Sequence, residues 1–218
     1  MARPSRNIDE LLLQAGRELL PETGCRGLSI RQVAERAGVN LGMFHYHFKT
    51  RENFVRTLLQ QIYEDMFSRL SPQPSPDMPP VEALRAAVRV VGRFARDNRR
   101  LLLRIIADAL GGDVLATEFL RANLPRHLSV VMSLIGACQA AGVLRLMPLP
   151  QAMGFLAGSV GSPILIGTAI AESGFAPPPM VAGFEAAVLS DEAIDARIDM
   201  ALRGLSADSF PASSGAAP

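Results

Sequence analysis

The stretch "SIRQVAERAGVNLGMFHYHF", which begins at Ser29, constrains the fold of this chain more than any other part of the sequence. A capping-box pattern at Ser29 predicts a short helix over residues 30–37, which Gly38 ends. Asn40 is a favourable N-cap for a second short helix over residues 41–48. Two short helices joined by a tight turn predict a helix-turn-helix, a motif whose second helix can enter the major groove of DNA.

Helical periodicity continues along almost the whole chain, and no convincing run of alternating β-branched residues interrupts it. A first helix over residues 8–20 is expected to end before Pro21 and Gly24. The longer helices are expected over residues 51–70, 81–98, 99–110, 114–141, 150–172 and 192–205. The sequence therefore predicts an all-α fold of about nine helices, three compact N-terminal ones followed by a larger helical bundle.

Two proline-rich stretches are expected to lie outside the helices. The run "SPQPSPDMPP" at residues 71–80 contains five prolines and separates the fourth helix from the rest as a linker or long loop. The end of the chain, residues 207–218, is small, polar and proline-ended, so we expect a disordered tail there.

Composition limits the class of protein. The 218 residues are 49% hydrophobic, which is enough for a sizeable core. The two cysteines, Cys25 and Cys138, lie far apart, so neither a disulfide framework nor a zinc ribbon is available, and a reduced cytoplasmic setting is expected. Residues 1–60 carry nine basic and six acidic side chains, a weak indication of a polyanionic partner.

Residues 146–171 contain no charged side chain and are long enough to span a bilayer. Pro148, Pro150 and Pro163 interrupt them, and no cluster of Lys or Arg flanks either end. We therefore expect no membrane span, but a helix that is covered by the core or by a second subunit.

The helix over residues 41–48 has chemistry suited to DNA. If Phe44 and Phe48, four residues apart, face the core, then the polar and aromatic side chains between them lie on other faces. Asn can pair with adenine, Leu can touch a thymine methyl group, and Tyr and His can donate to phosphate oxygens. The candidate DNA-binding residues are Ser29, Arg31, Asn40, Leu41, Gly42, His45, Tyr46, His47, Lys49 and Arg51.

The sequence supports a metal site or a catalytic site at these residues less well than it supports a DNA-binding surface. His45 and His47 are two residues apart and diverge by about 200° on a helix, whereas helical ligands that share a metal are three or four apart. The sequence has no Gly-x-Ser-x-Gly elbow and no phosphate-binding glycine motif with its lysine. We expect no metal, no cofactor and no enzymatic activity.

Residues 8–54 resemble the DNA-binding domain of the TetR family of bacterial transcriptional regulators. The resemblance rests on "LLQAGRELLPETG" and on "LSIRQVAERAGVNLGMFHYHFKTRENF". His45 departs from the pattern, since the family usually has Tyr there, and Asn40 replaces a frequent Ser. The resemblance implies a helix-turn-helix domain at residues 1–50 and an effector-binding and dimerisation domain at residues 51–206.

The resemblance also implies two sites in the second domain. The family's last two long helices pair with those of a second subunit, and small residues that would allow close helix approach are Gly154, Ala157, Gly158 and Gly161. The helices that surround the family's effector cavity would contribute Tyr63, Phe67, Phe94, Ile105, Asp108, Phe119, His127, Met132 and Phe155. Because these side chains are mostly apolar, a small, mostly apolar effector is expected.

The sequence therefore predicts a cytoplasmic, homodimeric repressor that binds a near-palindromic operator in double-stranded DNA and is released by a small-molecule effector. Two alternatives stay open at this stage. One is a helical enzyme or small-molecule carrier that uses the C-terminal cavity. The other is a constitutive DNA-binding dimer without an effector.

Overall fold

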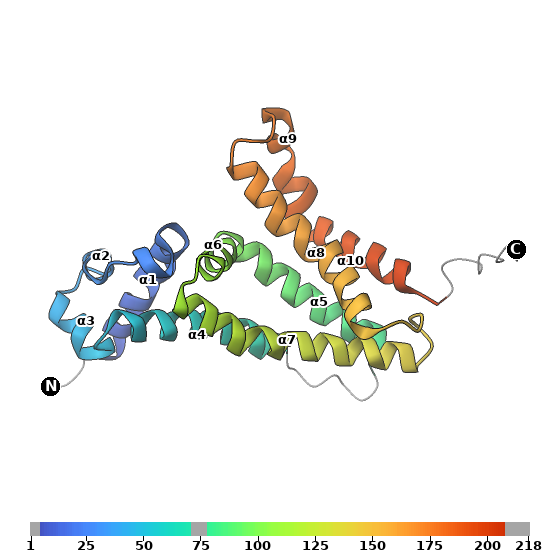
Figure 1. Cartoon of the computed structure of the whole chain (residues 1–218), viewed down its shortest axis with the longest axis horizontal. Coiled ribbons are helices and arrows are strands. Elements are labelled where there is room, and N and C mark those ends of the chain that lie inside the picture. Colours follow the sequence, from blue (N-terminus) through green and yellow to red (C-terminus); the bar gives the residue numbers. More distant parts are fainter. Residues whose placement is uncertain (1–4, 71–77, 208–218) are drawn as a thin grey trace, which may run out of the picture. The chain divides into compact units, whose positions relative to one another are not determined.

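The computed structural model describes residues 5–70 and 78–207, and these residues are all-α (Figure 1). Ten α-helices and one π-helical turn, Glu185–Leu189, follow one another in this part of the chain. The helices are α1 (Ser5–Gly27), α2 (Ile30–Arg36), α3 (Leu41–Phe48), α4 (Arg51–Leu70), α5 (Pro80–Asp97), α6 (Arg99–Leu110), α7 (Val114–Ala140), α8 (Leu149–Glu172), α9 (Pro178–Ala182) and α10 (Asp191–Leu205). The predicted fold class is confirmed, and the nine helices of seven or more residues correspond to the nine that were expected. Most of the predicted linker and all but one residue of the predicted tail lie outside the described residues.

Two differences from the expected helices have local causes. Helix α1 continues through Pro21, and its break comes only at Gly24, whose φ of 70° and ψ of 179° leave the helical region. Helix α9 was missed because "APPP" reads as a helix breaker, although proline is well suited to the first position of a helix, where α9 has Pro178.

The described residues form two compact units, of which the first comprises residues up to 68 together with residues 98–125. This division differs from the predicted boundary after residue 50, because α4 packs into the core of the N-terminal helices. Phe54 and Leu58 of α4 lie so close to Gly16 of α1 that a Cβ atom at Gly16 would be 2.6 Å from Phe54 Cζ. Helix α6 packs against α1 in the same unit.

The second unit comprises residues 69–97 and the chain from residue 126 onward, and its core is formed by α5, α8 and α10. Gly92 of α5 allows the three helices to approach, since a Cβ atom there would lie 3.2 Å from Val160 and 3.3 Å from Ile194. Beside this core, arginines four residues apart on α5 meet aspartates four apart on α10. The ion pairs are Arg85–Asp199, Arg89–Asp195 and Arg93–Asp191, and Arg96 also pairs with Asp191.

Helix α8 is the one helix of the described part that is long and apolar enough to cross a membrane, with a hydropathy of 1.6. Length and composition alone are weak evidence, because core helices of soluble proteins pass the same test. One stripe of α8 is buried, at Ala152, Leu156, Val160, Ile164 and Thr168. Gly154, Ala157 and Gly158 are exposed, as is Ile166 at 57%. An apolar face of α8 is therefore left uncovered by its own chain.

Candidate nucleic-acid interface

Helices α2 and α3 are set by the caps that the sequence predicted. Ser29 Oγ accepts a hydrogen bond from Gln32 N at 3.5 Å, and Asn40 Oδ1 accepts one from Met43 N at 3.0 Å. Between them, Gly38 takes a φ of 68°, a left-handed conformation that suits glycine. An N-cap of this kind contributes about 1 kcal/mol to stability, so the start of α3 is fixed by its own sequence.

Two phenylalanines anchor α3 to the first unit. Phe44 is 0% exposed and Phe48 is 7% exposed, which confirms the predicted core face. Their rings lie 5.1 Å and 4.8 Å from the ring of Phe54 at the start of α4. Because each buried aromatic ring contributes about 1.5–3 kcal/mol, this cluster holds α3 in one orientation.

The opposite side of α3 is turned to solvent. Tyr46 on this side is 71% exposed, and Leu41, the first residue of α3, is also 41% exposed. Of the ten candidate DNA-binding residues, those that the structure leaves exposed are Arg31, Asn40, Leu41, Gly42, His45, Tyr46 and Lys49. Together these residues of α2, of α3 and of the two ends of α3 combine cations, hydrogen-bonding groups and apolar groups, which is the chemistry that phosphates and base edges require.

The histidines of α3 differ in their surroundings. His45 is exposed, and its Nδ1 lies 3.2 Å from the carbonyl oxygen of Lys49. His47 is half-buried, and its Nε2 has no hydrogen-bond partner in the structure. Within residues 5–70 and 78–207, no group of three or more His, Cys, Asp or Glu side chains could hold a metal ion.

Arg51 is placed differently from the other candidates. Its guanidinium donates to the carbonyl oxygens of Cys25 and Arg26 and pairs with Glu52. These contacts tie the first residue of α4 to the end of α1. The guanidinium therefore already has partners inside the unit, unlike the exposed Lys49, and its contact with a phosphate stays a prediction.

The segment around Gly24 receives further contacts from the end of α6 and the start of α7. Asp108 Oδ2 accepts from Cys25 N at 2.7 Å, and Arg104 donates to the carbonyl oxygen of Thr23. Arg26 donates to the carbonyl oxygen of Gly111 and pairs with the buried Asp113, which caps α7 by accepting from Ala116 N. Apart from Gly24, which marks a break in the helix, no pattern in the sequence predicts this network. Asp108 was instead predicted to line an effector pocket.

Cys25 lies inside this network. Burial, together with the negative charges of Asp113 and Asp108, raises the pKa of its thiol to about 12. A thiol with such a pKa is inert as a nucleophile at neutral pH. Cys25 is therefore a packing residue of the first unit.

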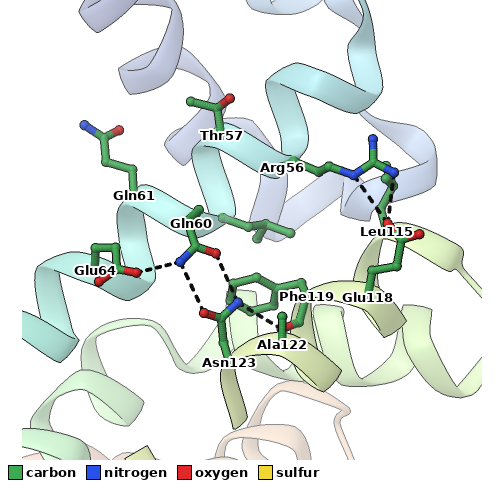
Figure 2. A pocket seen from close by; sticks show the side chains of 11 residues that line it. Arg56, Thr57, Gln60, Gln61, Glu64, Leu115, Glu118, Phe119, Ala122 and Asn123 are labelled. Carbon is green, nitrogen blue, oxygen red and sulfur yellow. Dashed lines mark hydrogen bonds and ion pairs between the residues drawn. The ribbon is translucent and has the colours of Figure 1, made fainter. Parts of the chain in front are cut away.

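The nine residues of the predicted effector cavity are divided between the units. Tyr63, Phe67, Ile105, Asp108 and Phe119 belong to the first unit, and Phe94, His127, Met132 and Phe155 belong to the second. Of the nine, only Phe119 lines the pocket of the first unit that lies between α4 and α7 and is shown in Figure 2. Tyr63 is buried next to it, stacked on Phe67 and edge-on to Phe119.

Comparison with known proteins supports the prediction that the N-terminal helices form a helix-turn-helix domain. Residues 12–58 match the family model described as bacterial regulatory proteins, tetR family. The repressor KstR2 of Mycolicibacterium smegmatis is 29% identical over 68 residues, covering 31% of this chain and 33% of that protein. KstR2 of Rhodococcus jostii is 31% identical over 58 residues, 27% of this chain and 28% of that protein. The chain thus matches about a third or less of the length of these curated relatives.

The fold agrees over a longer range. The structure of PfmR, a TetR-family regulator of Thermus thermophilus, superposes with a TM-score of 0.62 at 19% identity, covering 89% of this chain and 98% of that chain. Fold and surface together define a helix-turn-helix protein with a helical C-terminal part. The helix-turn-helix domain matches the DNA-binding domain of the TetR family over residues 12–58.

Proposed function

We propose that this protein is a transcriptional regulator that binds operator DNA through α3 and acts as a repressor. The observation that carries the proposal is the two-sided structure of α3, with Phe44 and Phe48 fixed in the core and Tyr46, about 200° around the helix from Phe44, exposed to solvent. An exposed aromatic ring on a rigid, capped helix is well placed to contact DNA. The match of residues 12–58 to a regulator family supports the same reading.

Roles within the surface follow from chemistry. Arg31, Asn40, Leu41 and Tyr46 would read bases, while His45, His47 and Lys49 would position phosphates. Ser29 would lie close to the DNA backbone because it caps the start of α2. Such a regulator acts in the cytoplasm, where bacterial DNA is found.

A direct test uses a fluorescently labelled duplex taken from upstream of the gene that encodes this protein. In an anisotropy titration, the full-length protein should bind it more tightly than a shuffled duplex, and Tyr46→Ala should weaken specific binding. Glu10→Gln, at an exposed carboxylate of α1, is the control. Wild-type affinity in Tyr46→Ala would remove Tyr46 from the interface.

We also propose that the protein acts as a homodimer through the uncovered face of α8. A Cβ atom at Gly154, Gly158 or Gly161 would meet nothing within 4 Å, so this face is open to a second helix. Large apolar side chains flank it, since Phe155 is 47% exposed and Ile166 57% exposed. A contiguous apolar face of this kind favours burial against another copy, and a two-fold dimer would present two α3 helices to successive major grooves.

The dimer can be tested by a substitution that the single chain tolerates. Gly158→Leu adds a side chain where its own chain leaves space, so folding should be retained while a close helix contact between subunits is blocked. Light scattering should report about twice the chain mass of 23.4 kDa for the wild type and a single chain for the variant. Ala140→Leu, at an exposed position of α7, is the matched control and should remain dimeric.

Release by a small molecule is the remaining part of the proposal. The effector would bind one arrangement of the protein and operator DNA another, with the same coupling free energy in both directions. Helix α4 starts three residues after α3 ends and also lines the pocket of the first unit. A ligand in that pocket would therefore contact the helix that follows α3.

A further inference from the structure

The carboxyl end of α3 closes in an unusual turn that reaches one ring nitrogen of His45. Within residues 5–70 and 78–207, Lys49 is the one non-glycine residue with a positive φ, at 63° with a ψ of −53°. The N–H of Thr50 donates to the carbonyl oxygen of Phe48 at 2.7 Å, so Lys49 is the centre of a γ-turn. The carbonyl oxygen of Lys49 lies 3.2 Å from His45 Nδ1. The turn thus brings a main-chain acceptor to the ring.

This contact determines where the proton of a neutral His45 ring lies. A carbonyl oxygen can only accept a hydrogen bond, so Nδ1 carries the hydrogen and donates it to Lys49. A neutral imidazole has a single N–H group, so Nε2 is left with a lone pair. His45 is exposed, and its Nε2 makes no hydrogen bond to any residue that the structure describes. The neutral ring therefore presents an acceptor to solvent.

An acceptor is the wrong group for DNA. Phosphate oxygens are anionic acceptors, so a lone pair on Nε2 cannot bind them. Moving the single proton to Nε2 would break the hydrogen bond to Lys49. Adding a second proton leaves that bond in place and gives Nε2 a hydrogen and the ring a positive charge, which together form a charge-assisted hydrogen bond to a phosphate. One proton therefore converts His45 into a phosphate-binding group.

The other groups that could change charge near neutral pH are placed differently. The chain has three histidines. His47 Nε2 is buried without a hydrogen-bond partner, so a proton there is not presented to solvent, and His127 belongs to the second unit. Burial raises the pKa of the thiols of Cys25 and Cys138 above their usual value. His45 is therefore the histidine of α3 that presents a proton to a ligand at the surface.

The charged groups around α3 leave the ring of His45 without a carboxylate partner. Helices α1, α2 and α4 pack around α3. The charged side chains of α2, of residues 8–18 in α1 and of the first turn of α4 are Asp9, Glu10, Arg17, Glu18, Arg31, Glu35, Arg36, Arg51 and Glu52. Within residues 5–70, none of these carboxylates forms an ion pair or a hydrogen bond with His45. An incoming phosphate would therefore be the anionic partner of the imidazolium.

We infer that His45 is a proton-dependent contact to a DNA phosphate, so that the protein binds its operator more tightly when the ring is protonated. The affinity would then respond to pH in the range from about 5 to 8, in which histidine changes its charge. This inference rests on the proposed function and adds to it a signal that requires no bound effector. The position of the proton on the neutral ring does not depend on DNA binding and can be measured alone.

The proton position is tested by long-range ¹H–¹⁵N correlation spectra of the full-length protein without DNA. At about pH 7.5 the neutral form of His45 should be protonated at Nδ1 and unprotonated at Nε2, because Lys49 holds the hydrogen at Nδ1. The signals of His45 are assigned by their loss in His45→Gln. A neutral ring that is protonated at Nε2 overturns the inference.

The DNA contact is tested by anisotropy titrations at about pH 5.5 and 7.5, at constant salt, with the duplex from upstream of the gene and with a shuffled duplex. The wild type should bind the first duplex about tenfold more tightly at the lower pH, because a charge-assisted hydrogen bond is gained. His45→Gln and His45→Tyr carry groups that donate at both pH values, so their affinities should change less than about threefold. Glu10→Gln, at an exposed carboxylate of α1, should keep the wild-type pH dependence.

The outcomes separate this inference from the proposed function. Specific binding by the wild type that is equally tight at both pH values, or a pH dependence that both His45 variants retain, overturns the role of His45 alone. Specific binding at neither pH rejects the proposed regulator. Circular dichroism checks that the variants are folded, and because two different side chains replace the ring, either folded variant decides the result.

Discussion

Asp108 Oδ2 accepts a 2.7 Å hydrogen bond from the backbone N–H of Cys25, 83 residues earlier in the chain. The contact is close because Gly24 leaves no side chain in the way, and a Cβ atom there would lie 2.6 Å from the same carboxylate oxygen. Together with Arg51, which donates to the carbonyl oxygen of Cys25, it fixes the turn between α1 and α2. The turn that leads into α2 is therefore linked to Asp108 of α6 by one hydrogen bond.

Asp108→Ala should lower the free energy of unfolding by about 1–3 kcal/mol, because it leaves a buried N–H group without its acceptor. Urea denaturation followed by circular dichroism measures the change. The control is Asp65→Ala, which removes a carboxylate that is 59% exposed and pairs with Arg17. An exposed ion pair of this kind contributes about 0–1 kcal/mol, so equal losses in the two variants would contradict the role of Asp108.

Two neighbouring cations should differ in how they affect DNA binding. Lys49 is exposed, so Lys49→Gln should reduce the slope of log affinity against log salt by about 0.9 for each phosphate that the protein no longer neutralises. Arg51→Gln should instead lower the free energy of unfolding by about 1–3 kcal/mol, because the guanidinium binds main-chain carbonyls. The measurements are anisotropy at several salt concentrations and urea denaturation. A salt slope reduced by a full unit in Arg51→Gln, with stability unchanged, would reverse the assignment.

Asn40 combines a structural and a proposed recognition role, and two substitutions separate them. Asn40→Ser keeps an N-cap oxygen for Met43 N, so stability should stay within about 0.5 kcal/mol of the wild type. Asn40→Ala should cost about 1 kcal/mol through loss of the cap. Both variants lack the amide that can pair with adenine, so both should change sequence preference in a binding-site selection. Equal loss on operator and random DNA for Asn40→Ser would refute base recognition by this residue.

The ion pairs between α5 and α10 predict a pH-dependent stability. Hydrogen bonding from Arg96 and the positive charge of Arg93 hold the pKa of Asp191 below its usual value in the folded protein. A lowered folded pKa favours the folded state above the unfolded pKa of about 3.9, and this contribution is lost as the pH falls through the folded pKa. Asp191→Asn should therefore destabilise the protein at neutral pH and have less effect in acid.

Urea midpoints at about pH 7, 4 and 3 test this expectation. The difference between the wild type and Asp191→Asn should shrink toward the acid end. Glu192→Gln, an exposed carboxylate in the same first turn of α10, controls for the helix dipole. A difference that stays constant down to pH values below about 4 would contradict the role of the ion pairs.

The helices and the exposed surface of α3 were predictable because they depend on local patterns. Caps at Ser29 and Asn40 and the spacing of Phe44 and Phe48 fix α2 and α3 whatever the rest of the chain does. The division into units was not predictable in the same way, since it depends on which long-range face α4 buries. From the sequence alone, Phe54 is an ordinary apolar residue of a helix. Only the structure shows that its ring packs closely against Gly16, which is far away in the sequence.

The pocket between α4 and α7 could not be predicted from the sequence for a related reason. Tyr63 and Ile105, which the resemblance implied for an effector cavity, are 3% and 2% exposed and do not line this pocket, so their role in a cavity stays a prediction. The groups that line the observed pocket are polar residues of α4 such as Gln60, which read as an ordinary solvated face. Their significance comes from Asn123, which is brought opposite Gln60 only by the packing of α7 on α4.

Recognition of a specific DNA sequence by the exposed face of α3 is tested most directly by one anisotropy experiment. Full-length protein is titrated at about 150 mM salt into the duplex from upstream of its own gene and into a shuffled duplex of equal length. Binding to the first duplex should be at least about a thousandfold tighter than to the second, and Tyr46→Ala should reduce that preference by about tenfold or more. Equal affinity for the two duplexes, or a preference that Tyr46→Ala leaves unchanged, would contradict sequence recognition by α3.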